Sequence, residues 1–167
     1  LKVLFPFTFS NGNATYDISL GTITRGIRNS DCYEVQGHQW ADHSLPTGQY
    51  GVSILNDCKY GWDKPADNNL RLTLLHTPKT KKSYAYQDHQ DFGHHIFTYT
   101  LTGHSGALDK TVASTAADCL NQRIKAFSAT KHAGPLGKSF SMASVDNKDL
   151  AMKALKRAQN GDEYVVR

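Results

Sequence analysis

The densest group of side chains that could bind a ligand lies in one short run, residues 55–63. An apolar segment ends there and is followed by an amide, carboxyl groups, an ammonium and aromatic rings: Asn56, Asp57, Lys59, Tyr60 and Trp62. Such groups can recognise sugars, because amides and carboxylates bond vicinal hydroxyls while a ring stacks on the apolar sugar face. Composition alone favours a simpler interpretation, an exposed turn in which Asn56 and Asp57 bond the local backbone.

A second polar stretch, residues 36–44, surrounds Trp40. This tryptophan is either a sugar platform or a buried ring whose indole N–H needs a partner. The first interpretation predicts an exposed side chain, and the second predicts a buried one.

Histidines could suggest a metal site, because several of the eight in the chain lie close together with two aspartates: His89, His94, His95 and His104, with Asp88 and Asp91. On a strand, however, the adjacent His94 and His95 point to opposite faces and cannot both bind one ion. We therefore interpret these histidines as packing or surface residues and expect no metal site in this chain.

Other catalytic motifs are missing from the sequence. It contains no GxSxG nucleophile elbow and no glycine cluster of the kind that cradles phosphates. The three cysteines, Cys32, Cys58 and Cys119, have no CxxC spacing. One bridge with a free thiol and three buried thiols both fit this set, so the redox compartment stays open.

Composition limits the class of protein. A chain of 167 residues with 39% hydrophobic and 20% charged residues predicts one globular domain over residues 1–167, without a membrane span. The net charge of +4 is spread thinly along the chain, which argues against a nucleic-acid partner.

Short runs of β-forming residues separated by turn signals predict a mainly β fold. We expect strands at residues 2–9, 14–20, 22–25, 50–55, 70–75 and 95–101. Pro6 places the first of these at a sheet edge or a bulge. The simplest architecture for this pattern is two packed antiparallel sheets.

Helical signals are scarce. Residues 109–121 have an acidic start and apolar side chains at helical spacing, which predicts one short helix. Residues 149–159 could be a second helix, but Asn160-Gly161 followed by Tyr164 to Val166 favours a hairpin. The chain starts at Leu1 and stops within an apolar run, so we expect an incomplete fragment of a larger β domain.

Several stretches, taken in order, resemble the C-terminal region of the glycoside hydrolase family 38 α-mannosidases. They are YDISLGTITR (16–25), HQWADHS (38–44), YGVSILNDCKYG (50–61), LRLTLLHTP (70–78) and HIFTY (95–99), continued by LNQ (120–122) and SFS (139–141). The LNDCKYG block is the most specific of these, and the resemblance spans nearly the whole chain. It also favours the hairpin over the helix at residues 149–159.

The resemblance implies a supersandwich-like antiparallel β-sandwich that serves as an accessory part of a retaining, metal-dependent α-mannosidase. In the family, an N-terminal α/β barrel supplies the nucleophile and the ligands of a zinc-like ion. No counterpart of that barrel is found in this chain, so we expect no catalytic residue, metal ligand or cofactor, and no activity of the chain alone. The expected partners are the barrel of the same polypeptide and mannosyl glycans, and the oligomeric state of the parent is left open.

By the same resemblance, Asn56, Asp57, Lys59 and Tyr60 are the candidates for a loop that faces the barrel or the substrate. Trp40, Trp62, His76 and His95 are weaker candidates. Relatives often have arginine at the position of His76, and histidine offers fewer donors than the guanidinium fork, which weakens a substrate-contact role there.

Two other hypotheses remain: a carbohydrate-binding module built on Trp40, Tyr60 and Trp62, and a structural domain whose exposed apolar surface promotes self-association. The compartment is undetermined between the cytoplasm and the periplasm or exterior, and we expect a bacterial host.

Overall fold

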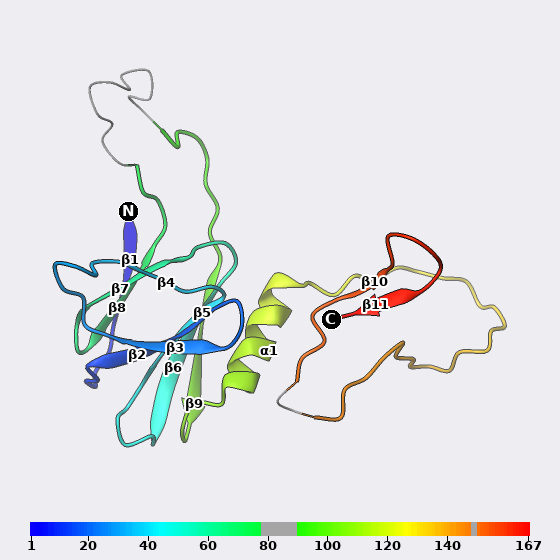
Figure 1. Ribbon diagram of the computed structural model, residues 1–167, viewed down its shortest axis with the longest axis horizontal. Coiled ribbons are helices and arrows are strands. Elements are labelled where there is room, and N and C mark those ends of the chain that lie inside the picture. Colours follow the sequence, from blue (N-terminus) through cyan, green and yellow to red (C-terminus); the bar gives the residue numbers. More distant parts are fainter. Residues whose placement is uncertain (78–89, 148–149) are drawn as a thin grey trace. The chain divides into compact units, whose positions relative to one another are not determined.

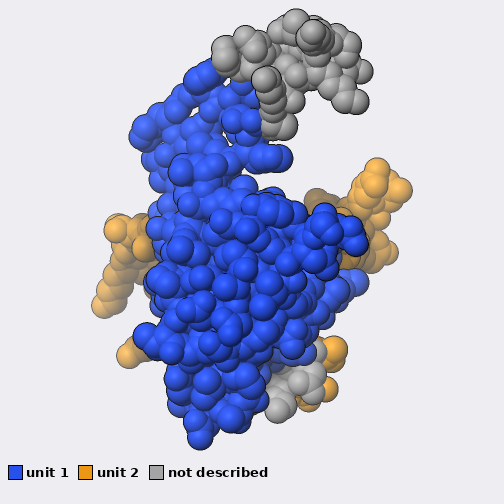
Figure 2. Space-filling view, turned by 90° about the vertical axis from the view of Figure 1, so that its left-hand side faces the viewer, with its two compact units in different colours: residues 1–124 blue, residues 125–167 orange. Residues whose placement is uncertain are grey.

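The computed structural model describes residues 1–77, 90–147 and 150–167. Contacts divide the chain into two compact units, Leu1–Ile124 and Lys125–Arg167, which Figure 2 shows in blue and orange. The structure therefore differs from the single domain expected over residues 1–167. The physical reason is burial, because no described residue after Ala117 is buried and the second unit has no core of its own.

Unit 1 contains two antiparallel sheets, and the first has four strands in the order β1-β8-β7-β4 (Figure 1). These are β1 (Lys2–Pro6), β8 (Asn69–Thr73), β7 (Gly61–Ala66) and β4 (Val35–Gln36). Pro6 has no N–H for a ladder, and the position of β1 at the sheet edge accommodates it, as predicted.

The second sheet has five strands in the order β3-β2-β5-β6-β9. These are β3 (Thr22–Gly26), β2 (Asn13–Asp17), β5 (Trp40–Ser44), β6 (Tyr50–Asn56) and β9 (Tyr99–Ser105). The interior strand β6 pairs along its whole length with the edge strand β9, from Tyr50 opposite Ser105 to Asn56 opposite Tyr99.

The core of unit 1 lies between the two sheets. Alternate residues of each strand point inward, as the period of two along a strand requires. The first sheet contributes Phe5, Trp62, Leu70 and Leu72, and the second contributes Ala14, Tyr16, Ala41 and Ile54. This packing confirms the predicted mainly β fold with two antiparallel sheets.

A single helix, α1 (Lys110–Asn121), packs on the second sheet through strands β5 and β6. Its first N–H groups are capped by Asp109, which accepts hydrogen bonds from Thr111 N and Val112 N. Ala113 and Ala117 then form a second small core with Trp40 and Leu55. The helix predicted at residues 109–121 is confirmed.

Three strands, β4, β5 and β7, were missed by the sequence patterns, and one is displaced. Strands β5 and β7 carry polar residues in buried positions, among them Asp42, His43, Asp63 and Lys64, so neither shows a clean apolar alternation. The strand expected at residues 95–101 forms instead as β9, because its extent is set by pairing with all of β6.

Unit 2 contains one antiparallel hairpin, β10 (Leu155–Arg157) with β11 (Tyr164–Val166). Gly161 lies between them at φ +92°, a conformation that glycine adopts without steric cost. The hairpin predicted in place of a helix is confirmed, although its first strand is shorter than residues 149–159. All six strand residues are exposed.

No helix among the described residues is long and apolar enough to cross a membrane.

A lysine and a histidine are buried between the two sheets. Lys64 on β7 is 1% exposed, and its Nζ donates to Asp67 O at 2.8 Å and lies 3.5 Å from His43 Nδ1. Burial lowers the pKa of Lys64 to about 8. Burial and the neighbouring Lys64 ammonium also lower the pKa of His43, whose ring packs against Phe7 and Phe9. A charged group buried in this way weakens the fold.

We predict that Lys64→Met stabilises unit 1. At pH 7 Lys64 is protonated both folded and unfolded, so the native state carries the full cost of the buried charge, on the order of 2 kcal/mol. Asp67 O keeps a partner in the variant, because it also accepts from Asn11 N at 2.9 Å. Denaturant unfolding at pH 7 should show a gain that shrinks as the pH rises from about 8 to 10.5, where the wild-type native state sheds the proton.

The control is Lys110→Met, which removes an exposed lysine at the start of α1. It should change the free energy of unfolding by no more than about 0.5 kcal/mol. A gain from Lys64→Met that does not vary with pH would contradict the assignment of a buried, destabilising charge.

Candidate functional site

The loop that joins β6 to β7 is held by one buried side chain, Asn56, which is 2% exposed. Its Nδ2 donates to His38 O at 2.9 Å, and its Oδ1 accepts from Lys59 N at 2.6 Å. Its backbone N donates to Gln39 O, and its backbone O accepts from Asn121 Nδ2 at the end of α1. Asn56 therefore ties the loop to the residues just before β5 and to α1. It does not face outward as the sequence analysis expected.

The next residues, Asp57, Cys58 and Tyr60, are exposed, and Lys59 is half-buried. Asp57 N donates to Thr98 O at 3.1 Å, which anchors the start of the turn to the segment before β9. Burial by itself would raise the pKa of Asp57, but hydrogen bonds from Cys58, Thr98 and the backbone lower it. Asp57 thus presents a carboxylate at neutral pH. We name residues 57–60 the rim loop.

Aromatic rings support the rim loop on two sides. Lys59 Nζ lies 4.5 Å from the ring centroid of Phe97, on which His95 stacks at 5.9 Å. Tyr60, 59% exposed, makes an edge contact with His38, with ring centroids 5.9 Å apart. His95 is therefore linked to the loop through Phe97. Sequence reasoning did not single out His38 and Phe97, because no local pattern shows that they meet the loop.

Both tryptophans are internal. Trp40 is 0% exposed, and its Nε1 donates to Ser114 Oγ on α1 at 3.1 Å, so it needed a hydrogen-bond partner. Trp62 is also 0% exposed and packs edge-on against Tyr16 in the core. Neither ring can stack on a sugar at the surface, and both candidates are corrected to core residues. Tyr60 remains as the exposed ring of the three.

His76 is exposed and follows β8, opposite the start of β7. Burial by itself would raise the pKa of Glu34, but hydrogen bonds from Lys2 and Thr73 lower it. The charges of Lys2 and His76 lower this pKa further. The structure thus places His76 near Glu34, and no contact between His76 and the rim loop is found among the described residues.

Two carboxylates lie close together beneath this end of the sandwich, Glu34 and the buried Asp63. Lys2 Nζ is 2.5 Å from an oxygen of each, and Arg71 Nε donates to Asp63 at 2.8 Å. Burial by itself would lower the pKa of Lys2, but the hydrogen bonds and charges of these two carboxylates raise it. Because an ammonium occupies the space between them, this pair cannot act as an acid and base on a substrate bond.

A second polar cluster lies on the outer face of the second sheet, the face on which α1 packs. Asp42, 2% exposed, accepts hydrogen bonds from Ser44 Oγ, from Ser53 Oγ at 2.7 Å and from His104 Nε2 at 3.0 Å. His104 Nδ1 faces the carbonyl of Gly106 at 3.2 Å. The ring therefore has no nitrogen free to activate a serine, and the cluster is not a nucleophile triad.

The remaining candidate residues for a metal site do not form a common site among the described residues. Asp88 and His89 lie outside the described residues, and His94 is exposed. Among the residues that are described, no three His, Cys, Asp or Glu side chains are grouped so that they could hold a metal ion. Cys32, Cys58 and Cys119 are free and exposed, so neither alternative, one bridge with a free thiol or three buried thiols, describes them.

The site therefore offers hydrogen bonding and ring contacts from an anchored loop, with an exposed carboxylate and phenol beside a half-buried lysine. This chemistry suits the contact with a polar surface or a sugar better than bond cleavage.

Comparisons with known proteins agree with this picture. Residues 1–84 match the family described as the glycosyl hydrolases family 38 C-terminal domain. The mouse protein named alpha-mannosidase 2C1 is 34% identical over 169 residues, which cover 98% of this chain and 15% of the relative. Alpha-mannosidase G of Dictyostelium discoideum is 30% identical over 161 residues, covering 93% of this chain and 14% of the relative. The chain thus spans a small part of these relatives.

A solved structure described as an alpha-mannosidase from Enterococcus faecalis has the same fold. It superposes with a TM-score of 0.81 at 19% identity, covering 99% of this chain and 20% of that one. At this identity the likeness supports the fold alone.

We predict that Asn56→Ala lowers the free energy of unfolding by about 2–3 kcal/mol, because it removes a buried amide and leaves polar groups without partners. Lys59 N loses its acceptor, so amide hydrogen exchange should rise in the rim loop more than in β6. Gln49→Ala removes an exposed amide in the same unit and serves as the control. Equal exchange rates in the two variants would show that Asn56 does not hold the loop.

Proposed function

The chain belongs to the C-terminal domain family of the family 38 glycosyl hydrolases, and from this membership we propose that it is the accessory β portion of an α-mannosidase. The whole enzyme would remove terminal α-mannosyl residues from glycans with retention of configuration. The catalytic barrel would lie elsewhere in the same polypeptide and would be the main partner of this chain.

The proposed division of labour rests on the acidic residues of the described structure. Retaining hydrolysis needs two carboxyl groups about 5–5.5 Å apart on either side of the scissile bond. The close pair, Glu34 and Asp63, is bridged by Lys2 and has no room for that bond. We therefore propose that the chain alone is inactive.

The zinc-like ion of the family resemblance does not fit the described residues, which hold no suitable group of ligands. In the proposal the ion is bound by the rest of the polypeptide, and no step of the reaction is assigned to it through this chain.

The observation that carries the role of this chain is the rim loop on its buried Asn56 anchor. A loop whose backbone is tied to the residues just before β5, to α1 and to the segment before β9 can hold its exposed groups in a fixed position. Residues held in this way fix the geometry of a neighbouring catalytic centre better than a mobile loop does. We propose that Asp57, Lys59 and Tyr60 contact the barrel or the substrate at its rim.

A carbohydrate-binding module is the second candidate function. The burial of Trp40 and Trp62 removes two of its three aromatic platforms. Tyr60 alone would offer a single stacking surface, which favours the accessory role.

The 167-residue chain by itself is also expected to self-associate. Unit 2 exposes most of its large apolar side chains, including Phe127, Phe140 and Met142. Exposed apolar area of this kind normally marks a surface that another part of a protein covers.

The first test compares the full-length polypeptide with the 167-residue chain on a chromogenic α-mannoside, with and without a chelator. Activity in the full-length protein alone, abolished by the chelator, is the expected result. Turnover by the isolated chain, or by neither protein, would overturn the proposal.

A second test replaces Tyr60 by alanine in the full-length polypeptide. We expect kcat/KM to fall about tenfold, because a small displacement at the catalytic centre is costly. A fall in kcat alone would indicate contact with the barrel, whereas a rise in KM would indicate contact with the substrate. The matched control is Tyr50→Ala, an exposed tyrosine at the opposite end of β6. If both variants retain wild-type kinetics, the rim loop has no role in activity.

A further inference from the structure

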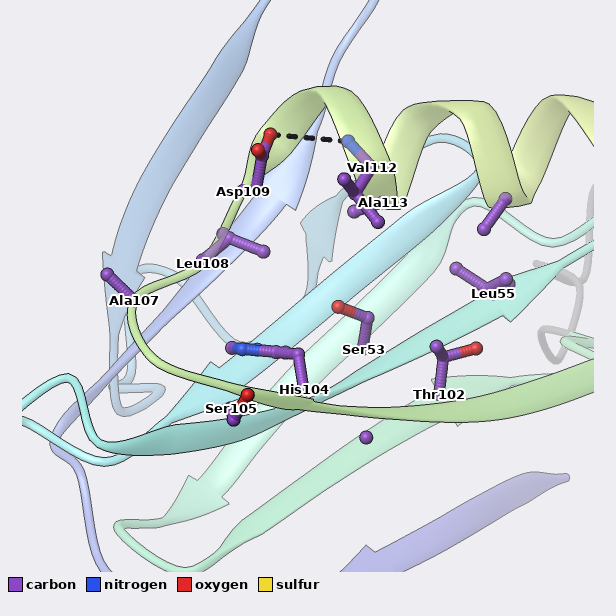
Figure 3. Close-up of a pocket in the computed structure, with 12 residues that line it drawn as sticks. Ser53, Leu55, Thr102, His104, Ser105, Ala107, Leu108, Asp109, Val112 and Ala113 are labelled. Carbon is purple, nitrogen blue, oxygen red and sulfur yellow. Dashed lines mark hydrogen bonds between the residues drawn. The ribbon is translucent and has the colours of Figure 1, made fainter.

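A hollow of about 350 Å³ lies between α1 and strands β6 and β9 (Figure 3). The helix covers Trp40 and Leu55 but leaves the edge of β9 open. Small side chains, Ala107, Ala113 and Ala116, create the space. The rim loop and its neighbours His38, His95 and Phe97 do not line it.

One wall of the hollow is polar and is fixed by a buried carboxylate. Asp42 holds Ser53 and His104 through hydrogen bonds of 2.7 and 3.0 Å, and the His104 ring is fixed again at Gly106 O. Figure 3 shows Ser53 and His104 directed into the hollow beneath Leu108. Because these groups are already oriented, a ligand would not have to order them.

The same wall carries hydroxyl groups that are not in use. Thr102 and Ser105 of β9 line the hollow, and within the described part of the chain neither hydroxyl has a hydrogen-bond partner. Each can donate one hydrogen bond and accept others.

The opposite wall is apolar, formed by Leu55, Leu108 and the α1 residues Val112 and Ala116. Val112 is 61% exposed although it faces this space. Apolar atoms on one side and hydroxyls on the other match a ring that has an apolar face and a polar edge.

The charges narrow the class of ligand. No lysine or arginine lines the hollow, which disfavours phosphate or sulfate groups. The one lining carboxylate at the mouth, Asp109, caps α1 through Thr111 N and Val112 N. A neutral ligand satisfies both walls without burying an unpaired charge.

We propose that this hollow is a binding site for a neutral polyhydroxy ring of hexose size, separate from the rim loop. The apolar face of the ring packs on Val112 and Ala116, and its hydroxyls bond the hydroxyl groups of Thr102 and Ser105. Because no phenylalanine, tyrosine or tryptophan ring lines the hollow, the affinity is in the millimolar range, about 1–10 mM. The inference does not depend on the catalytic proposal, since it needs only unit 1 to be folded.

Alanine methyl groups provide local probes of the site. With ¹³C-labelled alanine methyls, methyl α-D-mannopyranoside is added to about 50 mM, well above the expected Kd. Saturable shifts are expected for Ala113 and Ala116, which line the hollow, and not for Ala14 and Ala41, which lie between the sheets. The titration is run on both the 167-residue chain and the full-length polypeptide, so that misfolding of the isolated chain cannot hide binding.

Two isosteric variants of one strand face test the contact. Thr102→Val removes a hydroxyl that lines the hollow and should weaken binding about fivefold, the effect of one hydrogen bond. Thr100→Val makes the same change two residues along the same face of β9, outside the hollow, and should leave the Kd unchanged. Inorganic phosphate serves as a second ligand.

Three results would overturn the site: no saturable shift in either protein, an equal response to phosphate, or equal weakening by the two variants. A sugar response in an enzyme without mannosidase activity would support the site and reject the catalytic proposal. Mannosidase activity without a sugar response would reject the site and support the catalytic proposal.

Discussion

The structure depends on a constraint imposed by β6, which is buried on both faces. Ile54 points into the core between the sheets, while its neighbour Leu55 points to α1, because successive side chains of a strand lie on opposite faces. Both ladders of the strand are also used, by β5 and β9. A strand enclosed in this way requires a second sheet below it and a helix above it. The short α1, with its alanine face, meets the second requirement.

The end of that strand determines where the candidate site begins. Buried residues run without a break from Ser53 to Asn56, whose polar groups must find partners inside the protein. They do so by holding the turn that follows, His38 and Gln39 before β5, and Asn121 at the end of α1. The groups beyond it are exposed but stand on a fixed base. A loop that presents a carboxylate, an ammonium and a phenol on such a base is suited to contact and positioning, which is the accessory role proposed above.

Buried polar residues give the two faces of the second sheet different chemistry. On the inner face, His43 lies beside Lys64 with no carboxylate paired to that lysine in the described structure, and the arrangement costs stability. On the outer face, Asp42 is fully hydrogen-bonded to Ser44, Ser53 and His104, and its network orients one wall of the hollow. A satisfied network rigidifies its surroundings, whereas an unpaired buried charge weakens them.

The sequence by itself determined the β class, the helix that Asp109 caps and the hairpin around Gly161, because each follows from contacts between residues close in the chain. It also marked residues 56–60, since a change from apolar to polar side chains is visible locally. Only the tertiary structure decided which of those residues face outward. Trp40, Trp62 and Asn56 are buried because segments distant in sequence cover them, and His38, Phe97 and His104 join their sites for the same reason. The local pattern records the type of a side chain, but its exposure depends on which remote segments pack against it.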